Sequence, residues 1–218
     1  MKTLAAVAAA LLISLGAITA PASADKASHP PALRVVTAGD SISAGAGTVS
    51  RRFSWPGRLH RRNLRTIDLT NVARSASCLI AEGCGYGETL ASSFRRDVLS
   101  LRPDVAIVAI GRNDLCHVST SDYKATMRNL RVEAEKVGVR VIFGTITPPN
   151  ERWQWPCEDQ AAEINEWLLR MPGTIDFASA IAGRDGLLRK RYDFGDGLHP
   201  NGRGQQAMAR AAEAALLG

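Results

Sequence analysis

An apolar run from Asp104 to Ile110, between Pro103 and Gly111, constrains the fold most strongly. Continuous runs of this kind are typical of strands buried on both faces, as in parallel sheets. Four further short runs rich in apolar or β-branched residues predict strands in the same sheet: Leu33–Ala38, Thr66–Asn71, Val139–Ile146 and Thr174–Phe177. The chain is therefore expected to build a five-stranded parallel sheet.

Helical patterns alternate with these strands and predict five helices: Trp55–Leu64, Glu88–Leu99, Lys124–Val137, Glu158–Arg170 and Pro200–Leu217. Ser121 is the expected N-cap of the third helix, and Gly138 its end. Residues 178–193 have no clear pattern. Strands alternating with helices require parallel pairing with right-handed crossovers, which predicts an α/β fold, a three-layer α/β/α sandwich. A flavodoxin-like strand order 2-1-3-4-5 places the topological switch point beside Ser41.

The first 24 residues resemble a secretory signal peptide rather than part of the fold. Lys2 gives a basic start, Leu4–Ile18 is apolar, and Ala22-Ser23-Ala24 offers small residues for cleavage. A membrane anchor is the alternative, but Gly16 and Pro21 interrupt the run before the roughly 20 residues that a span needs. We expect cleavage before Asp25, a disordered segment 25–32, one domain over 33–218, no membrane span, and a monomeric, secreted or periplasmic protein.

Four cysteines in an exported chain predict two disulfides, with three possible connectivities. Cys78 and Cys84 share one glycine-rich loop, which leaves Cys116 and Cys157 for each other. A metal site would require C-x-x-C pairs or histidines at ligand spacing, and the sequence has neither. We therefore expect structural disulfides and neither metal nor cofactor.

The formal net charge is +6, and arginines crowd the stretch from Arg51 to Arg65. Such a cluster indicates either an anionic partner or the solvated face of a helix. The solvated face of a helix is favoured over a nucleic-acid partner.

Three motifs are expected to meet at the carboxyl edge of the sheet. Gly39-Asp40-Ser41 follows the first strand, Gly111-Arg112-Asn113-Asp114 follows the third, and Asp196-Gly197-Leu198-His199 precedes the last helix. A serine hydroxyl needs a base, and the base needs an orienting group, so Ser41, His199 and Asp196 are the candidate catalytic residues. The backbone N–H of Ser41 and the side-chain amide of Asn113 are candidate oxyanion donors.

Each motif also has a purely structural interpretation. Gly-Asp-Ser often forms a turn, an asparagine after glycine is often a turn residue, and Asp196 resembles a helix cap. The other histidines, His29, His60 and His117, are interpreted as surface or structural. The G-x-S-x-G elbow of the α/β-hydrolase fold fits less well, because position 43 is serine and the acid and base share one loop.

Together the motifs resemble the SGNH hydrolase superfamily, the GDSL esterases and lipases, over the whole mature chain. The resemblance implies a catalytic Ser41, an oxyanion-hole Asn113, and Asp196 and His199 as acid and base. The block that normally reads Asn-x-Gly-x-x-Gly, whose last glycine gives a backbone donor, is here Asn71-Val72-Ala73-Arg74-Ser75-Ala76. The N–H of Ala76 can replace that donor, although a positive φ would strain an alanine.

The expected function is a serine esterase that forms an acyl-enzyme with short acyl groups, such as acetyl esters of carbohydrates or other small molecules. Trp153 and Trp155, on the loop after the fourth strand, either bind substrate or pack structurally. The alternatives are a lipase or lysophospholipase of the same family, a non-catalytic carbohydrate- or envelope-binding domain, and a metal-dependent phosphoesterase using Asp40, Asn113, Asp196 and His199. The last is disfavoured because too few histidines converge.

Overall fold

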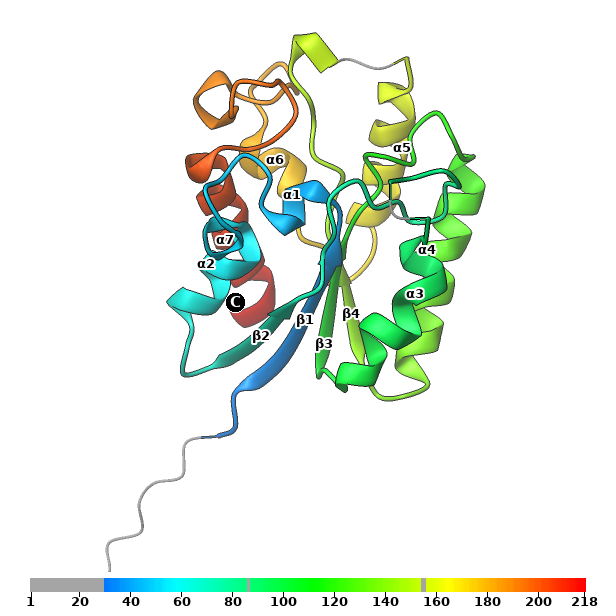
Figure 1. The fold of residues 1–218 in the computed structure, drawn as a ribbon, viewed down its shortest axis with the longest axis vertical. Coiled ribbons are helices and arrows are strands. Elements are labelled where there is room, and N and C mark those ends of the chain that lie inside the picture. Colours follow the sequence, from blue (N-terminus) through cyan, green and yellow to red (C-terminus); the bar gives the residue numbers. More distant parts are fainter. Residues whose placement is uncertain (1–29, 86, 154–155) are drawn as a thin grey trace, which may run out of the picture. The chain divides into compact units, whose positions relative to one another are not determined.

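A computed structural model describes residues 30–85, 87–153 and 156–218. The expected signal peptide and residues 25–29 of the expected disordered segment 25–32 lie outside the described residues. Within them, four strands form one parallel sheet in the order β2-β1-β3-β4 (Figure 1). The strands are β1 (Leu33–Gly39), β2 (Ile67–Asn71), β3 (Val105–Ala109) and β4 (Arg140–Phe143).

Helices cover both faces of this sheet, as the strand patterns predict. One layer contains α2 (Trp55–Arg62), α6 (Phe177–Ile181) and α7 (Gly202–Leu217). The opposite layer contains α3 (Leu90–Asp97), α4 (Thr120–Glu135) and α5 (Glu158–Leu169), which Figure 1 shows on the other side of the strands. The expected three-layer α/β/α sandwich is confirmed.

Strand side chains alternate between the two layers, because successive residues of a strand point to opposite faces. Ile107 packs in the cluster that contains Trp55 of α2 and Met208 of α7, whereas Val108 packs in the cluster that contains Phe94 and Met127. Full burial of such side chains stabilises a fold by roughly 1.5 to 3 kcal/mol each. This two-sided burial explains why the β3 sequence is continuously apolar.

The expected fifth strand, Thr174–Phe177, is reduced to a single parallel bridge between Gly144 and Ile175. The Ile175 N–H donates to the Phe143 carbonyl, and its own carbonyl accepts from Thr145. The segment cannot continue as a strand because Asp176 already caps α6, accepting from the Ser179 N–H. The position beside β4 is therefore correct, but its extent is wrong.

Helix starts also differ from the expectation. Ser119, not Ser121, caps α4 by accepting from the Asp122 N–H at 3.1 Å. Asn201 caps α7, so this helix begins at Gly202 rather than at Pro200. The remaining short helices are α1 (Ser41–Ala44), η1 (Arg51–Phe53), η2 (Leu99–Leu101), η3 (Glu151–Trp153) and η4 (Lys190–Tyr192). In the described ranges, every helix is too short or too polar to cross a bilayer.

Candidate active site

Ser41 is the first residue of α1, directly beyond the carboxyl end of β1. The Asp40 side chain caps this short helix by accepting from the Ile42 N–H at 3.0 Å. At Gly39 the chain passes so close to β3 that a Cβ would lie 2.2 Å from the Ala109 carbonyl oxygen. Glycine is therefore required for the sharp strand-to-helix turn that presents the Ser41 hydroxyl.

Ser41, His199 and Asp196 form one hydrogen-bonded chain. The Ser41 Oγ lies 2.9 Å from His199 Nε2, and His199 Nδ1 lies 2.6 Å from Asp196 Oδ2. Burial raises the pKa of Asp196, but the N–H groups of His199 and Leu198 and the imidazole outweigh it, so this pKa lies below its usual value. The carboxylate is therefore ionised at neutral pH and orients the imidazole toward the serine.

Contacts across the site hold residues 196–199, called the acid–base loop here because it carries Asp196 and His199, the candidate acid and base. The Asn150 N–H donates to the Gly197 carbonyl at 2.7 Å, and the Asn150 amide donates to Asp193 at 2.7 Å. Gly197 has φ +84°, and a Cβ there would lie 2.3 Å from Asn150 Oδ1. This close approach requires glycine at position 197, so the structure explains why a glycine follows Asp196.

Two amides of distant residues fix the backbone of α1 behind Ser41. The Asn71 side chain, at the end of β2, donates to the Ser43 carbonyl at 2.9 Å. The Gln205 side chain, from α7, donates to the Ile42 carbonyl at 3.0 Å and accepts from the Trp55 N–H at 2.7 Å. Buried amides that use both donor and acceptor specify one arrangement of the elements they join.

The candidate oxyanion donors come from three separate segments. Within the described hydrogen bonds, the N–H groups of Ser41 and Ala76 have no acceptor, so both are available to a ligand. Ala76 has φ +58°, a positive value that strains an alanine. The Asn113 amide donates one proton to the Ser77 carbonyl at 2.8 Å, which ties the third strand's loop to the segment containing Ala76.

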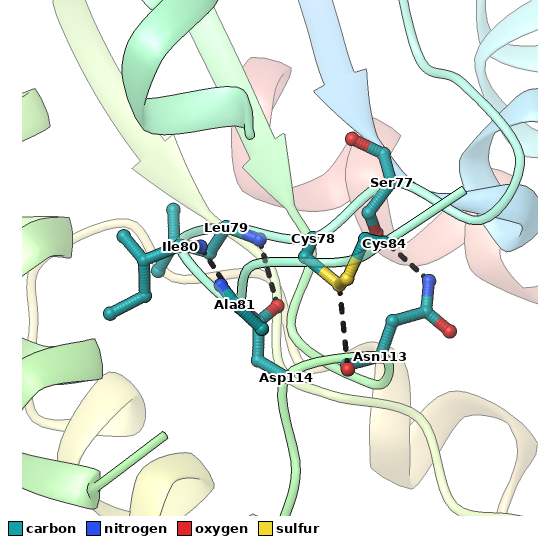
Figure 2. Close-up of a disulfide and its surroundings, with 8 residues drawn as sticks. All are labelled: Ser77, Cys78, Leu79, Ile80, Ala81, Cys84, Asn113 and Asp114. Atoms are coloured by element: carbon teal, nitrogen blue, oxygen red, sulfur yellow. Dashed lines mark hydrogen bonds between the residues drawn. A yellow bond between two sulfur atoms is a disulfide. The ribbon is translucent and has the colours of Figure 1, made fainter. Parts of the chain in front are cut away.

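Asp114 anchors the segment that follows Ala76 (Figure 2). Its carboxylate is almost fully buried and accepts from the N–H groups of Leu79, Ile80 and Ala81 at 2.8 to 3.0 Å. Burial raises its pKa, and the three N–H donors partly offset that effect. Because all three donors are backbone groups, Asp114 fixes the course of the chain here.

The disulfides have the expected pairing, Cys78–Cys84 and Cys116–Cys157. The first closes the loop that Asp114 anchors, and Cys78 Sγ lies 3.4 Å from the Asn113 carbonyl oxygen (Figure 2). The second joins the loop after β3 to the start of α5. Both cross-links therefore restrain loops at the carboxyl edge of the sheet.

Of the two tryptophans in the 147–157 loop, the structure describes only Trp153. Trp153 is 40% exposed, and its ring lies so close to Gly197 that a Cβ there would be 2.8 Å from Trp153 Cδ1. This places Trp153 beside the acid–base loop, whereas Trp155 lies outside the described residues.

His60 accepts from the Leu69 N–H at 3.3 Å, His117 is exposed, and His29 lies outside the described residues. In the described part of the chain, no group of three or more acidic, histidine or cysteine side chains could hold a metal ion.

Asp40 and Arg112 line a small internal cavity behind Ser41, of about 20 Å³. Burial raises the pKa of Asp40 to about 6, against the opposing effects of the Ile42 N–H, His199 and Arg112. Arg112 is buried, and its guanidinium donates to Glu158 at 2.6 Å and to the Thr147 carbonyl at 2.5 Å. It thereby joins the loops that follow β3 and β4.

Several of these supporting residues could not be identified from the sequence. Asp114 and Arg112 lie inside a recognised motif, but nothing in their spacing indicates the backbone groups that they bind. Asn71 stands at a strand end, where an amide is a weak signal for a loop contact. Gln205 has no signal, because a glutamine in a helix is usually exposed.

The GDSL-like Lipase/Acylhydrolase family profile matches residues 37–207, which is most of the chain. The matched region includes all three motifs at the site. The chain belongs to this family of ester-hydrolysing enzymes. No curated protein matches it.

Solved structures share the fold at low sequence identity. A protein from Desulfitobacterium hafniense DCB-2, described as lipolytic and of the G-D-S-L family, is 21% identical with a TM-score of 0.71, over 84% of this chain and 99% of its own. An acetylxylan esterase from Geobacillus stearothermophilus is 20% identical with a TM-score of 0.67, over 86% and 95%. A GDSL-like lipase from Bacteroides thetaiotaomicron VPI-5482 is 20% identical with a TM-score of 0.64, over 84% and 86%. These likenesses establish the fold.

Proposed function

We propose that the protein is an exported, monomeric serine esterase that removes short acyl groups from carbohydrate esters through an acyl-enzyme intermediate. The observation that carries this proposal is the chain of contacts from Ser41 Oγ to His199 Nε2 and from His199 Nδ1 to Asp196, at 2.9 and 2.6 Å. These are the distances that proton transfer from a nucleophile to an oriented base requires. Two disulfides support export, because they persist in oxidising compartments.

In the first half-reaction, Ser41 Oγ attacks the ester carbonyl carbon while His199 Nε2 takes the hydroxyl proton. Asp196 stabilises the resulting imidazolium and fixes its orientation. The negative charge on the carbonyl oxygen is stabilised by the N–H groups of Ser41 and Ala76 and by the amide of Asn113. Each such donor is commonly worth about 10² to 10³ in kcat.

Collapse of this intermediate breaks the bond to the alcohol oxygen, which leaves with the proton from His199. A water molecule then attacks the acyl-enzyme, and His199 removes its proton. The second tetrahedral intermediate uses the same donors, and its collapse releases the carboxylic acid and returns the proton to Ser41. No step requires a group beyond these side chains and water.

The small cavity next to Ser41 has no room for a long acyl chain. The cavity lined by Asp40, Ser43 and Arg112 has a volume of about 20 Å³, room for about one water molecule. A long acyl chain cannot enter it and would have to lie on the surface. The Cys116–Cys157 disulfide restrains the 147–157 loop at its end, which opposes the wide opening that a lipid chain needs.

The alcohol side of the site favours a polar substrate. A groove of about 850 Å³ is lined by Asn150, Arg152, Asp193 and Gly195, directly beside the acid–base loop. Sugar hydroxyls match such alternating donors and acceptors, and an exposed tryptophan such as Trp153 offers an aromatic face for a sugar ring. These features support a carbohydrate ester over a phospholipid.

The decisive experiment measures kcat/KM for p-nitrophenyl esters from C2 to C16, together with an acetylated oligosaccharide and a lysophospholipid. We expect the maximum at C2 to C4 and faster release of acetate than of fatty acid. Asp196→Asn should lose less activity than His199→Ala, since the carboxylate orients the base without taking its proton. A maximum at C12 or longer, with lysophospholipid the best natural substrate, would favour the lipase alternative. Absence of turnover on every ester would favour a non-catalytic binding domain.

A further inference from the structure

Four arginines line one open hollow of about 680 Å³ next to the acid–base loop. They come from three elements, of which α2 is distant in sequence from the other two: α2 gives Arg58, η4 gives Arg191, and α7 gives Arg203 and Arg210. The volume is typical of ligand pockets. None of the residues that line this hollow is acidic. Only Arg58 belongs to the arginine cluster noted in the sequence, so the fold creates this grouping.

These four guanidinium groups form no close ion pair, although Arg210 lies near enough to Glu213 to help lower the pKa of that carboxyl. Across the described residues, none of them lies within 4.0 Å of an aspartate or glutamate oxygen, whereas seven arginines elsewhere form ion pairs: Arg34, Arg62, Arg74, Arg95, Arg96, Arg112 and Arg170. Four unpaired positive charges around one hollow repel one another, and an anion would relieve that repulsion.

Aromatic rings and a glutamine orient two of these groups without neutralising them. Arg191 stacks over the Tyr192 ring at 4.7 Å, and Arg58 stacks over the Phe53 ring at 5.6 Å. Arg58 also donates to Gln206 Oε1 at 3.0 Å. Stacking orients a guanidinium while leaving its edge free to bind two oxygens of a carboxylate or phosphate.

Gln206 gives an independent indication of a ligand. Its Nε2 is buried and has no acceptor in the described structure, and the residue lines the hollow. The amide cannot be turned round to remove the problem, because Arg58 offers only donors and must face the oxygen. A buried donor without an acceptor destabilises a protein by about 1 to 3 kcal/mol, and a ligand oxygen would satisfy this one after the side chain turns toward the hollow.

The hollow adjoins the groove assigned to the alcohol side of the ester. Arg191 lines both, so the two depressions share a wall. Asn201 also lines the hollow and follows His199 by only two residues, so their Cα atoms lie within about 8 Å of each other. A polymer bound along the groove would thus extend from the catalytic histidine directly to the arginines.

We propose that this arginine-lined hollow binds a carboxylate or phosphate group of an acidic carbohydrate polymer, and so positions an acyl ester of that polymer at Ser41. The inference rests on the proposed function for the ester and narrows the substrate to anionic glycans. The neutral sugar next to the ester occupies the groove, and an acidic group further along the chain accepts from the four arginines of the hollow, Arg58, Arg191, Arg203 and Arg210.

The test compares two double variants with the same change in charge. R203Q/R210Q removes two exposed arginines from the hollow. The matched control, R65Q/R140Q, removes two exposed arginines that form no ion pair in the described structure, near the amino ends of β2 and β4. Fluorescence anisotropy with labelled oligogalacturonate, oligo(glycerol phosphate) and neutral xylo-oligosaccharide measures Kd for each protein at low and moderate salt.

We expect the wild type to bind at least one acidic oligomer at least about tenfold more tightly than the neutral one. R203Q/R210Q should lose at least about tenfold in affinity for that oligomer and show a weaker salt dependence, as the loss of two charge-assisted contacts predicts. The control should stay within about twofold of the wild type. A preference for oligogalacturonate would indicate carboxylate recognition, and a preference for oligo(glycerol phosphate) would indicate phosphate recognition. Hydrolysis of neutral p-nitrophenyl acetate should be equal in all three proteins.

Equal losses in the two double variants would refute a specific site and indicate a net-charge effect. Tighter arginine-dependent binding to duplex DNA or to phosphatidylglycerol vesicles than to any glycan would refute the assignment to a carbohydrate. If the acidic oligomer binds through the arginines while no ester is cleaved, the proposed esterase function fails and the binding site stands. If p-nitrophenyl acetate is cleaved but acidic oligomers bind no better than neutral ones, the proposed binding site is refuted and the proposed esterase function stands.

Discussion

Replacement of Asp40 by asparagine should change how the stability of the protein depends on pH. Asp40 is 4% exposed, and its burial raises the carboxyl pKa to about 6. The Ile42 N–H, His199 and Arg112 oppose this effect, while the nearby Asp114 adds to it. The buried carboxyl is therefore held in its protonated form to a higher pH than in the unfolded chain.

The sign follows from proton binding. Between pH 4 and 6 the folded protein keeps a proton that the unfolded chain releases, so the free energy of unfolding falls as pH rises through this window. The difference between 3.8 and about 6 corresponds to about 3 kcal/mol. Stability that Asp40 contributes at low pH is thus lost by neutral pH.

Asp40→Asn cannot titrate, but its amide oxygen can still accept from the Ile42 N–H. The variant's free energy of unfolding, relative to wild type, should therefore rise by about 3 kcal/mol between pH 3.5 and pH 7. Urea unfolding followed by circular dichroism at several pH values measures this difference. Any constant penalty for the new NH₂ group cancels in the comparison.

Asp104→Asn is the matched control with the opposite sign. Its hydrogen bond and ion pair with Arg34 hold the pKa of Asp104 below its usual value, so its stabilising contribution is present at neutral pH and lost in acid. The Asp104 variant should therefore lose stability relative to wild type as pH rises. An Asp40→Asn difference that stays constant with pH, or that moves in the same direction as Asp104→Asn, would refute the reasoning.

Three further outcomes are expected at the site and its supports. Ser41→Ala and His199→Ala should each abolish ester turnover with unchanged circular dichroism, and labelling of any residue other than Ser41 by a serine-directed phosphonate would contradict this. Asn113→Ala should lower kcat by about 10² to 10³ in steady-state assays, while an effect on KM alone would assign it to substrate binding. Removing Cys78–Cys84 or Cys116–Cys157 by paired serine substitution should reduce stability in urea by about 2 and 4 kcal/mol, respectively, and equal losses would contradict the chain-entropy estimate.

The layers could be predicted from the sequence because they depend on local patterns, whereas the strand order was taken from the flavodoxin-like fold class. Continuous apolar runs such as Asp104–Ile110 indicate a strand that is buried on both faces. The fifth strand failed because its length depends on a competition that the pattern does not reveal: Asp176 caps α6 and ends the pairing after Ile175. The cap of α4 failed for a similar reason, since Ser119 and Ser121 are both good caps and packing selects between them.

Some features of the candidate site could likewise be predicted from the sequence, and others could not. The meeting of Ser41 with the Asp196–His199 loop could be predicted, because parallel strands bring their carboxyl ends to one edge. The buried supports could not, because Gln205 and Asp114 act on backbone groups far away in sequence. The arginine-lined hollow is the extreme case. Arg58 is separated from the other three arginines by more than 100 residues, and the packing of α2 against α7 brings it beside them.

The segment around Ala76 explains how this chain keeps a backbone donor without the glycine that the family pattern has. An alanine with positive φ is destabilised by roughly 1 to 2 kcal/mol. On one side, the Arg74 N–H donates to the Gly39 carbonyl; on the other, Asn113 holds the Ser77 carbonyl. Asp114 then binds three successive N–H groups, and hydrogen bonds to a charged group contribute about 1.5 to 3 kcal/mol each. These restraints outweigh the strain, so the Ala76 N–H stays free of protein acceptors, and alanine also limits the unfolded chain more than glycine would.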